Sequence, residues 1–347
     1  MKIAFINTSI NGGGAERATV NLANGLCKLD DMEIFLFTGN KKEKEYKIDS
    51  KIKRYCILQE NLLKDIKSLR KALHENRIDI AVGMGIYANF CVCMSNFGSK
   101  TKMVISERNS PLHDHLSKKS KLLRFLVYRN ADAYVFQTQE AKKFYSKSIQ
   151  KRGCVIHNPI RSDLPIKTDI NRKEIVAVGR LMPQKNYEML LHAIKKVHDR
   201  HSEFTLRIFG EGRSRNNLER LVSKIGIKDI VKFEGFTLDV HDQIKDSAIY
   251  VLSSDFEGMP NSLMEAMSMG FPVISTDCPC GGPAELIQNG KNGILVPVGD
   301  SDKMAMEINR LIEEPGECLK LGKNAMKIGQ THSQDVIVQQ WLKFLCG

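Results

Sequence analysis

Residues 252–287 read LSSDFEGMPNSLMEAMSMGFPVISTDCPCGGPAELI, and the order of patterns in this stretch decides the fold. An apolar run ends at Leu252, a short loop carries Glu257, and a helical pattern starts after Pro260, which the first turn of a helix accepts. A second apolar run, Pro272–Ser275, follows the helix. A strand, a helix and a second strand in this order predict a parallel strand pair joined by a right-handed crossover.

The same alternation extends over the whole chain. In the first half, apolar β-branched runs predict strands at Lys2–Asn7, Glu33–Thr38, Ile78–Val82, Lys102–Ser106, Ala133–Gln137 and Gly153–His157. In the second half they predict strands at Glu174–Gly179, Thr205–Phe209, Val231–Phe233, Ile249–Leu252, Pro272–Ser275 and Gly293–Val296. Amphipathic segments between them predict helices at 15–29, 60–76, 116–130, 186–200, 213–225, 261–269 and 302–314. This pattern predicts an α/β protein with two Rossmann-like domains facing a cleft.

The domain boundary is expected within residues 157–172, HNPIRSDLPIKTDINR, which contain two prolines and no periodicity. We therefore predict an N-terminal domain over 1–163 and a C-terminal domain over 164–332. A last helix over 333–347 is then available to pack back on the N-terminal domain.

The formal net charge of +12 is unevenly distributed. Residues 1–163 contain 29 Lys and Arg against 16 Asp and Glu, so the first half holds the whole positive excess. A basic domain of this kind suits an anionic membrane surface or a nucleic acid. Few aromatic residues lie among the basic ones, which argues against a nucleic-acid-binding protein.

We see no sequence pattern that indicates secretion, a membrane span or disulfide bonds. The N-terminus has no signal-peptide pattern, and residues 79–98, the one stretch near membrane-spanning length, are better explained as a buried strand and helix. The nine cysteines form no C-x-x-C pair, so neither a disulfide framework nor a zinc site is expected. We expect a cytoplasmic protein with reduced cysteines and no bound metal.

The loop and helix after Leu252 contain residues suited to a phosphorylated sugar. The first N–H groups of a helix form an anion site, here those of Asn261, Ser262 and Leu263. Gly258, Met259 and Pro260, in the loop before them, are further donor-binding candidates. Glu265 follows in a helix that is apolar nearly all round, so we expect it to be buried and to need hydrogen-bonding partners. Glu257 and Glu265 could then accept hydrogen bonds from several hydroxyls of one elongated ligand. The alternative for Glu265 is a solvated helix residue.

Three motifs in this region together resemble the signature of family 4 retaining glycosyltransferases, which have the GT-B fold. They are Glu257 and Glu265 separated by seven residues, GFPVIST at 270–276 and GGPAE at 281–285. The likeness extends from Asn11 to about Trp341 and is strongest to enzymes of bacterial capsule, O-antigen and exopolysaccharide synthesis. The resemblance implies that Glu265 binds the donor ribose and that Glu257 contacts hydroxyls of the transferred sugar. It also implies retention at the anomeric carbon, with neither metal nor cofactor.

Two further loops of the second half fit a nucleotide-sugar. VGRLMPQKN at 178–186 places Arg180 and Lys185 between a strand and a helix, where two cations can bind a diphosphate and stabilise it as a leaving group. An ordinary basic surface loop explains the pair equally well, but the resemblance assigns both as diphosphate ligands. Gly210 and Gly212, which follow another strand, permit close approach of a nucleotide, although a plain turn is the alternative.

The first half adds candidates next to two of its strands. In NGGGAER at 11–17, Gly13 and Gly14 can approach a phosphate, and the contiguous glycines do not fit the dinucleotide-binding fingerprint of a dehydrogenase. The resemblance places this loop at the junction of donor and acceptor. Many relatives carry a histidine near residue 107, whereas this chain has Glu107 and Arg108. Arg108 is a candidate phosphate ligand and Glu107 a candidate ligand of an acceptor hydroxyl, and a salt bridge between the two is the alternative.

The segment HLSKKSKLLRFLVYR at 115–129 reads as a basic amphipathic helix. Such a helix binds anionic headgroups with its cations, which here are Lys118, Lys119, Lys121 and Arg124. The alternative is that its apolar stripe packs on the sheet and its lysines are solvated.

These observations predict a glycosyltransferase that moves a hexose or N-acetylhexosamine from a nucleoside diphosphate, taken to be UDP, to a hydroxyl of a saccharide acceptor. We expect a lipid-linked acceptor and peripheral contact with the inner face of the cytoplasmic membrane. The alternatives are an epimerase or phosphorylase of the same fold and a basic nucleic-acid-binding protein.

Overall fold

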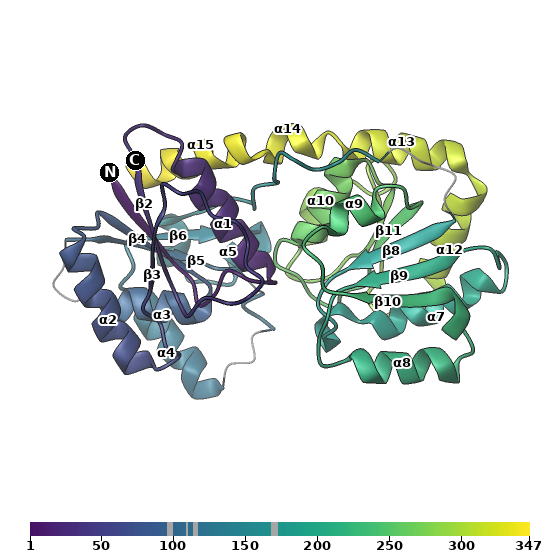
Figure 1. The fold of residues 1–347 in the computed structure, drawn as a ribbon, viewed down its shortest axis with the longest axis horizontal. Coiled ribbons are helices and arrows are strands. Elements are labelled where there is room, and N and C mark those ends of the chain that lie inside the picture. Colours follow the sequence, from purple (N-terminus) through teal and green to yellow (C-terminus); the bar gives the residue numbers. More distant parts are fainter. Residues whose placement is uncertain (96–99, 109, 114–116, 168–172) are drawn as a thin grey trace. The chain divides into compact units, whose positions relative to one another are not determined.

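The computed structural model describes residues 1–95, 100–108, 110–113, 117–167 and 173–347. The chain forms two compact units (Figure 1). Unit 1 contains Met1–Pro159 and His332–Gly347, and unit 2 contains Ile160–Thr331. The first crossing between them therefore lies a few residues before residue 163, inside the proline-containing segment.

Unit 1 is built on a seven-stranded sheet in the order β3-β2-β1-β4-β5-β6-β7, with every neighbouring pair parallel. Its strands are β1 (Lys2–Ile6), β2 (Glu33–Thr38), β3 (Lys53–Cys56), β4 (Ile80–Met84), β5 (Lys102–Ser106), β6 (Ala133–Phe136) and β7 (Gly153–Val155). Its helices are α1 (Gly14–Leu26), α2 (Leu62–Glu75), α3 (Ile86–Ser95), α4 (Lys118–Tyr128), α5 (Gln139–Lys143), α6 (Lys147–Lys151) and α15 (Gln334–Cys346).

The side chains of the unit 1 strands point alternately to the two faces of the sheet and so contribute to two apolar layers. Ile3 and Phe5 of β1 pack with residues of α1 and α15, whereas Ala4 and Ile6 pack with residues of α2 and α3. Successive side chains of a strand point to opposite faces, so one strand contributes to both layers. Trp341 of α15 is completely buried and meets the Phe5 ring edge-on. The last helix thus completes the core of unit 1.

The edge strand β3 was missing from the expected elements. Its side chains are mostly exposed or half-buried, and its sequence KRYC has no apolar alternation. Edge strands carry such polar residues because only one of their backbone edges is paired.

Unit 2 contains a six-stranded parallel sheet in the order β10-β9-β8-β11-β12-β13. Its strands are β8 (Glu174–Val178), β9 (Thr205–Phe209), β10 (Val231–Gly235), β11 (Ile249–Leu252), β12 (Val273–Thr276) and β13 (Ile294–Val296). Its helices are α7 (Tyr187–His198), α8 (Arg215–Lys224), α9 (Val240–Ile244), α10 (Asn261–Met269), α11 (Gly282–Leu286), α12 (Ser301–Glu313) and α13 (Pro315–Ala325), with short 3-10 turns at Pro183–Lys185 and Lys228–Ile230. The helix α14 (Ile328–His332) leads back toward unit 1.

The strand order of unit 2 reverses direction between β8 and β11. In open parallel sheets, ligands bind outside the carboxyl ends of the strands at such a switch point. The loops after β8, β9, β11 and β12 all leave this edge, and they contain the donor-side residues expected from the sequence.

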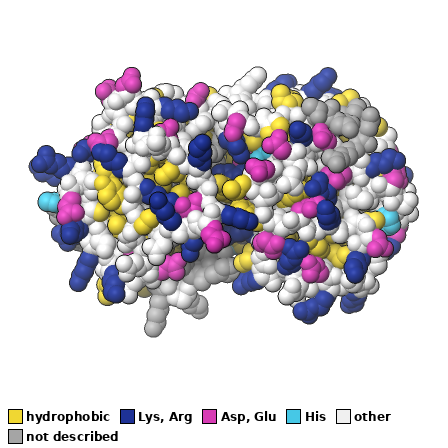
Figure 2. Space-filling view, in the orientation of Figure 1, with side chains coloured by type: hydrophobic (Ala, Val, Ile, Leu, Met, Phe, Trp, Pro, Cys, Tyr) yellow, Lys and Arg dark blue, Asp and Glu magenta, His cyan; other side chains and the backbone are white. Residues whose placement is uncertain are grey.

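Across the described residues, no helix is both long and apolar enough to cross a membrane. Residues 79–98 contain β4 and α3, as expected, and residues 96–99 lie outside the description. On the face drawn in Figure 2, Lys and Arg side chains are scattered among acidic ones rather than gathered into one patch.

Candidate active site

Hydrogen bonds hold together two loops of unit 2 that follow the adjacent strands β8 and β11. The Gln184 side-chain amide donates to the Phe256 carbonyl oxygen at 2.9 Å, and the Asn186 amide donates to Asp255 Oδ1 at 2.6 Å. Asn186 has a left-handed backbone conformation and also caps α7 by accepting from the Met189 N–H. The two loops therefore form one preorganised surface at the switch point.

Lys185 and Glu257, predicted for two different parts of a donor, are paired with each other. Lys185 Nζ lies 2.5 Å from Glu257 Oε1, and Ser254 Oγ donates to the same oxygen at 2.7 Å. The Lys185 and Glu257 side chains are only 13% and 9% exposed. The Arg180 side chain, by contrast, is exposed, and no hydrogen bond or ion pair joins it to another described residue. Arg180 thus presents a cationic charge that no described carboxylate offsets.

The motif GGPAE and the residues before it position the Glu257 loop. The Glu257 N–H donates to the Pro279 carbonyl at 2.7 Å, and the Cys280 N–H donates to the Glu257 carbonyl at 2.8 Å. A Cβ atom on Gly282 would lie 1.7 Å from the Gly258 carbonyl oxygen. This position therefore requires glycine because two backbones touch there.

Glu265 is buried in α10, as the apolar helix around it predicted, and its partner is His241 of α9. The His241 Nε2 atom lies 3.0 Å from Glu265 Oε2, and each residue is only 5% exposed. A carboxylate oxygen accepts hydrogen bonds and an imidazole N–H donates them, so the two groups are suited to this bond. His241 could not be recognised from the sequence, because a single histidine in a short helix has no distinguishing pattern.

The start of α10 differs in part from the expected anion site. The Leu263 N–H donates to the Pro260 carbonyl at 3.1 Å, so it is not available to a ligand as predicted. The side chains of Met259 and Leu263 are buried in the apolar core of unit 2. The backbone at Gly258 and Met259 and the first turn at Asn261 and Ser262 stay candidates for donor contacts.

Gly210 and Gly212 have a packing reason as well as the predicted ligand role. A Cβ atom on Gly210, whose φ is +138°, would lie 2.0 Å from the Gly179 carbonyl oxygen. One on Gly212 would lie 2.3 Å from the Leu181 carbonyl oxygen. The loops after β8 and β9 thus touch through their backbones, which brings the Arg180 loop next to the glycine loop.

In unit 1, Gly13 and Gly14 form the start of α1. Gly13 is the N-cap residue of α1. A Cβ atom at this position would lie 1.9 Å from Glu16 Oε2, so the Glu16 side chain occupies the space that a larger residue would need. Glu16 therefore folds back over the first turn. Both glycines lie at the carboxyl end of β1, beside the point where the strand order of this sheet reverses.

Glu107, the candidate ligand of an acceptor hydroxyl, is only 2% exposed. Its Oε2 accepts a hydrogen bond of 2.5 Å from the Tyr145 hydroxyl, within an aromatic cluster that includes Tyr128. Burial and the nearby Glu107 charge raise the pKa of Tyr145 well above its ordinary value. The tyrosine therefore stays a hydrogen-bond donor to the carboxylate, and Glu107 belongs to the core of unit 1.

Arg108 is also buried, at 6% exposure, and forms no ion pair with a described residue. It donates to Asn158 Oδ1 at 2.6 Å, contacts Met84 Sδ at 3.5 Å and lies 5.7 Å from the centre of the Trp341 ring. Its Nε has no hydrogen-bond partner among the described residues. Burial lowers the pKa of Arg108 to about 9. The alternative of a salt bridge to Glu107 is therefore wrong.

The helix α4 is oriented differently from both expectations. Arg124, predicted to face lipid, is 3% exposed and lies over the rings of Phe144 and Tyr145. The exposed residues are apolar, with 46% to 62% of the side chain accessible at Leu122, Leu123, Phe125 and Leu126. Lys121 is half-buried, and the side chains of Lys118 and Lys119 lie outside the description.

The thiols of the structure show no arrangement for metal binding. Burial raises the pKa of Cys91, Cys93 and Cys278 to about 12, so these groups stay protonated. Within the described ranges, no three His, Cys, Asp or Glu side chains are grouped closely enough to hold a metal ion.

Two units that are each built on a parallel sheet give the chain the GT-B fold, and solved structures agree. Anabaena HepE in complex with UDP-glucose superposes with a TM-score of 0.85 at 20% identity, covering 100% of this chain and 99% of that one. The apo lipopolysaccharide outer core galactosyltransferase WaaB superposes with a TM-score of 0.74 at 23% identity, covering 100% of this chain and 99% of that one.

Sequence comparisons give the family. Residues 12–164 match Glycosyltransferase Family 4, and residues 161–328 match Glycosyl transferases group 1. The chain is 30% identical to the GalNAc-alpha-(1->4)-GalNAc-alpha-(1->3)-diNAcBac-PP-undecaprenol alpha-1,4-N-acetyl-D-galactosaminyltransferase of Campylobacter jejuni, over 99% of this chain and 98% of that protein. It is 23% identical to the amylovoran biosynthesis glycosyltransferase AmsD of Erwinia amylovora, over 98% and 97%. The chain belongs to glycosyltransferase family 4.

Proposed function

We propose that this glycosyltransferase moves a hexose or N-acetylhexosamine from a UDP-sugar to a hydroxyl of a lipid-linked saccharide, with retention at the anomeric carbon. The observation that carries the proposal is the hydrogen-bonded surface at the switch point of unit 2, with Arg180, the Lys185–Glu257 pair and the Glu265–His241 pair. UDP-glucose bound to HepE and the undecaprenol-linked substrate named for the Campylobacter relative support the donor and acceptor classes. The product would enter a bacterial surface polysaccharide.

In this proposal each donor group meets one part of the surface. Arg180 and Lys185 bind the diphosphate, Glu265 accepts hydrogen bonds from the ribose hydroxyls, and Glu257 accepts them from the transferred sugar. The Lys185–Glu257 pair keeps both charges partly neutralised until the donor arrives. When Lys185 turns to the diphosphate, Glu257 gains a free acceptor oxygen for a sugar hydroxyl. His241 orients the Glu265 carboxylate.

The chemistry then requires charge stabilisation at the leaving group. The bond from the anomeric carbon to the diphosphate oxygen breaks, the acceptor oxygen bonds to the same face of that carbon, and the acceptor proton passes to the leaving phosphate oxygen. Negative charge develops on the diphosphate, and preorganised cations are often the largest single contribution to such catalysis. Arg180 and Lys185 supply this charge, so we propose that transfer needs no metal ion.

We further propose that α4 attaches unit 1 to the inner face of the cytoplasmic membrane. The residues Leu122, Leu123, Phe125 and Leu126 expose a contiguous apolar helix face, and such exposed faces mark interaction sites. The adjacent positive excess of residues 1–163 favours an anionic bilayer. The membrane contact therefore rests on apolar insertion, with Arg124 withdrawn into the core.

A thermal-shift panel with UDP-sugars, GDP-sugars and nicotinamide cofactors, each with and without EDTA, tests the donor. A ligand at one hundred times its dissociation constant stabilises a fold by about 2.7 kcal/mol. We expect selective stabilisation by UDP-sugars that EDTA does not change. A response to nicotinamide cofactors alone would contradict the proposal. Turnover of a UDP-sugar with no saccharide acceptor present would instead favour an epimerase or phosphorylase.

A further inference from the structure

The loop of unit 2 that contains Arg180 and Lys185 is closed by a buried tyrosine at its far end. Tyr187, the first residue of α7, donates from its hydroxyl to the Gly179 carbonyl oxygen at 3.1 Å. Gly179 directly precedes Arg180, and Tyr187 follows Lys185 by two residues. This one hydrogen bond therefore joins the two ends of the segment that holds both proposed diphosphate ligands.

The Tyr187 hydroxyl is a firmly held donor. Tyr187 is 4% exposed and belongs to the apolar core that also contains Ile175 and Ile208 of two neighbouring strands. Burial raises the pKa of Tyr187 well above its ordinary value, so the hydroxyl stays protonated. A buried hydroxyl without a partner is costly, and the Gly179 carbonyl is the partner that this one has. The core therefore fixes the ring, and the ring fixes the carbonyl.

The backbone before Arg180 is also held by other contacts. A Cβ atom on Gly210 would lie 2.0 Å from the Gly179 carbonyl oxygen, so the backbone of the next loop touches this oxygen as well. The carbonyl of Val178 accepts a hydrogen bond of 3.4 Å from the hydroxyl of Tyr250, which is completely buried in β11. Both carbonyls that precede Arg180 are thus bonded to buried tyrosines.

Arg180 depends on this backbone for its direction. Its side chain is exposed, and within the described part of the chain no hydrogen bond or ion pair holds it. The Lys185 side chain passes over the same glycine, because a Cβ atom on Gly179 would lie 3.1 Å from Lys185 Cε. A shift of Gly179 would therefore move Arg180 and change the space along Lys185. A misplacement of about 1 Å can cost about 10²-fold in rate.

We infer that Tyr187 is a positioning residue of the transfer reaction, whose hydroxyl holds the Gly179 carbonyl and so directs Arg180 at the diphosphate. The inference rests on the proposed function, in which Arg180 stabilises the leaving group. An interaction that is realised only as this charge develops contributes to kcat and not to KM. Loss of the Tyr187 hydroxyl should therefore lower kcat and leave the KM for the donor nearly unchanged.

The test is a double-variant cycle of Tyr187→Phe and Arg180→Ala, read as kcat and KM of sugar transfer from the UDP-sugar that the thermal-shift panel selects. Tyr187→Phe keeps the ring in the core and removes only the hydroxyl. We expect this change alone to lower kcat by about tenfold, with KM within about twofold of wild type. In the Arg180→Ala background it should change kcat by less than about twofold, because its effect passes through Arg180.

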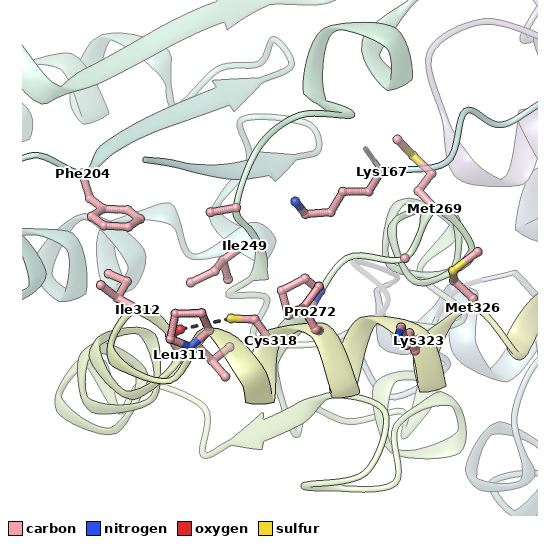
Figure 3. Close-up of a pocket in the computed structure, with 14 residues that line it drawn as sticks. Lys167, Phe204, Ile249, Met269, Pro272, Leu311, Ile312, Cys318, Lys323 and Met326 are labelled. Atoms are coloured by element: carbon pink, nitrogen blue, oxygen red, sulfur yellow. Dashed lines mark hydrogen bonds between the residues drawn. The ribbon is translucent and has the colours of Figure 1, made fainter. Parts of the chain in front are cut away.

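Two control variants separate positioning from a general loss of packing. Tyr134→Phe in unit 1 removes another buried hydroxyl, which donates to the Tyr128 carbonyl. Cys318→Ala removes a hydrogen bond of 3.0 Å from the thiol to the Leu311 carbonyl, in the pocket where the strands of unit 2 begin (Figure 3). Neither residue contacts the Arg180 loop, so both variants should keep kcat within about twofold of wild type per folded molecule.

Three results would overturn the inference. These are an unchanged kcat in Tyr187→Phe, an equal loss from this change in both backgrounds of the cycle, or an equal loss of kcat in Tyr134→Phe. Failure of the proposed function gives a different result. In that case Arg180→Ala itself leaves kcat unchanged, whereas a large loss in Arg180→Ala beside an unaffected Tyr187→Phe removes the inference alone.

Discussion

The buried charged side chains of the two units have different kinds of hydrogen-bonding partner. In unit 2, the carboxylates Glu257 and Glu265 have Lys185 and His241 as partners. In unit 1, Glu107 and Arg108 are adjacent in sequence and opposite in charge, yet they do not pair. Each instead bonds to a neutral group, Tyr145 or Asn158. Buried charges need partners, but sequence adjacency does not supply them.

The reason lies in the strand that precedes the pair. Successive side chains along an extended chain point to opposite faces of the sheet. After β5, Glu107 turns to the aromatic layer that contains Tyr145, and Arg108 turns to the layer closed by Trp341. The paired residues of unit 2 come from different loops and helices that meet at one edge of the sheet. We propose that the pairs of unit 2 are available to a ligand, whereas Glu107 and Arg108 bond to neutral groups in the core of unit 1.

The largest effect is expected where the unit 2 charges meet the leaving group. Arg180→Ala or Lys185→Ala should lower the rate of sugar transfer by about 10²–10³-fold, by analogy with the loss of one preorganised donor to a developing oxyanion. Steady-state transfer assays with a saccharide acceptor measure this. The matched control is Lys195→Ala, which removes a cation of α7 that pairs with Asp199 at the surface. Activity of either site variant within twofold of wild type would remove the diphosphate assignment.

The comparison also shows what sequence patterns can predict. The alternation of apolar runs predicted both parallel sheets, because strands buried on two faces have a strong signal. The buried state of Glu265 followed from the apolar residues around it in α10. His241 could not be predicted, since its contact depends on how α9 packs against α10. The outward apolar face of α4 was also missed, because helical spacing defines a stripe without stating which stripe meets the core.

A second, smaller effect tests the histidine–carboxylate pair. Glu265→Ala should weaken binding of UDP by about 10- to 100-fold, because a charged hydrogen-bond acceptor is worth about 1.5–3 kcal/mol. His241→Leu should weaken it by about tenfold, since the carboxylate loses the donor that orients it. His241→Gln retains an N–H donor and should recover part of the affinity. Calorimetric titration of UDP measures all three.

The outcome distinguishes orientation from simple packing at this pair. If His241→Gln binds UDP as weakly as His241→Leu at equal thermal stability, the hydrogen bond does not orient Glu265. An unchanged affinity in Glu265→Ala would contradict its ribose role and with it the importance of His241.

The unit 1 charges should affect stability rather than turnover. Glu107→Leu removes the acceptor of the Tyr145 hydroxyl and should lower the free energy of unfolding by about 1–3 kcal/mol, the cost of a buried donor without a partner. Tyr145→Phe should cost less, and the double variant should be less destabilised than the sum of the two, since they share one hydrogen bond. Urea denaturation measures these values. A fall in transfer rate per folded molecule of tenfold or more in Glu107→Leu would return Glu107 to the active site.

The smallest effect is expected at the exposed face of α4, where the contact is apolar and reversible. Replacing Leu122 and Phe125 by serine removes two exposed side chains, at 62% and 47% exposure, and so should leave the thermal stability nearly unchanged. Each apolar side chain of this size contributes about 1.5–3 kcal/mol when fully buried, and partial insertion yields less. Sedimentation with vesicles that contain phosphatidylglycerol should therefore fall severalfold. The control is Leu63→Ser on α2, which removes a leucine that is 74% exposed, and so more exposed than Leu122, from another helix of unit 1. Equal loss of sedimentation in both variants would mean that α4 has no special role. Unchanged sedimentation in the double variant would assign the contact to the basic residues alone, in which case raising the salt concentration should abolish it.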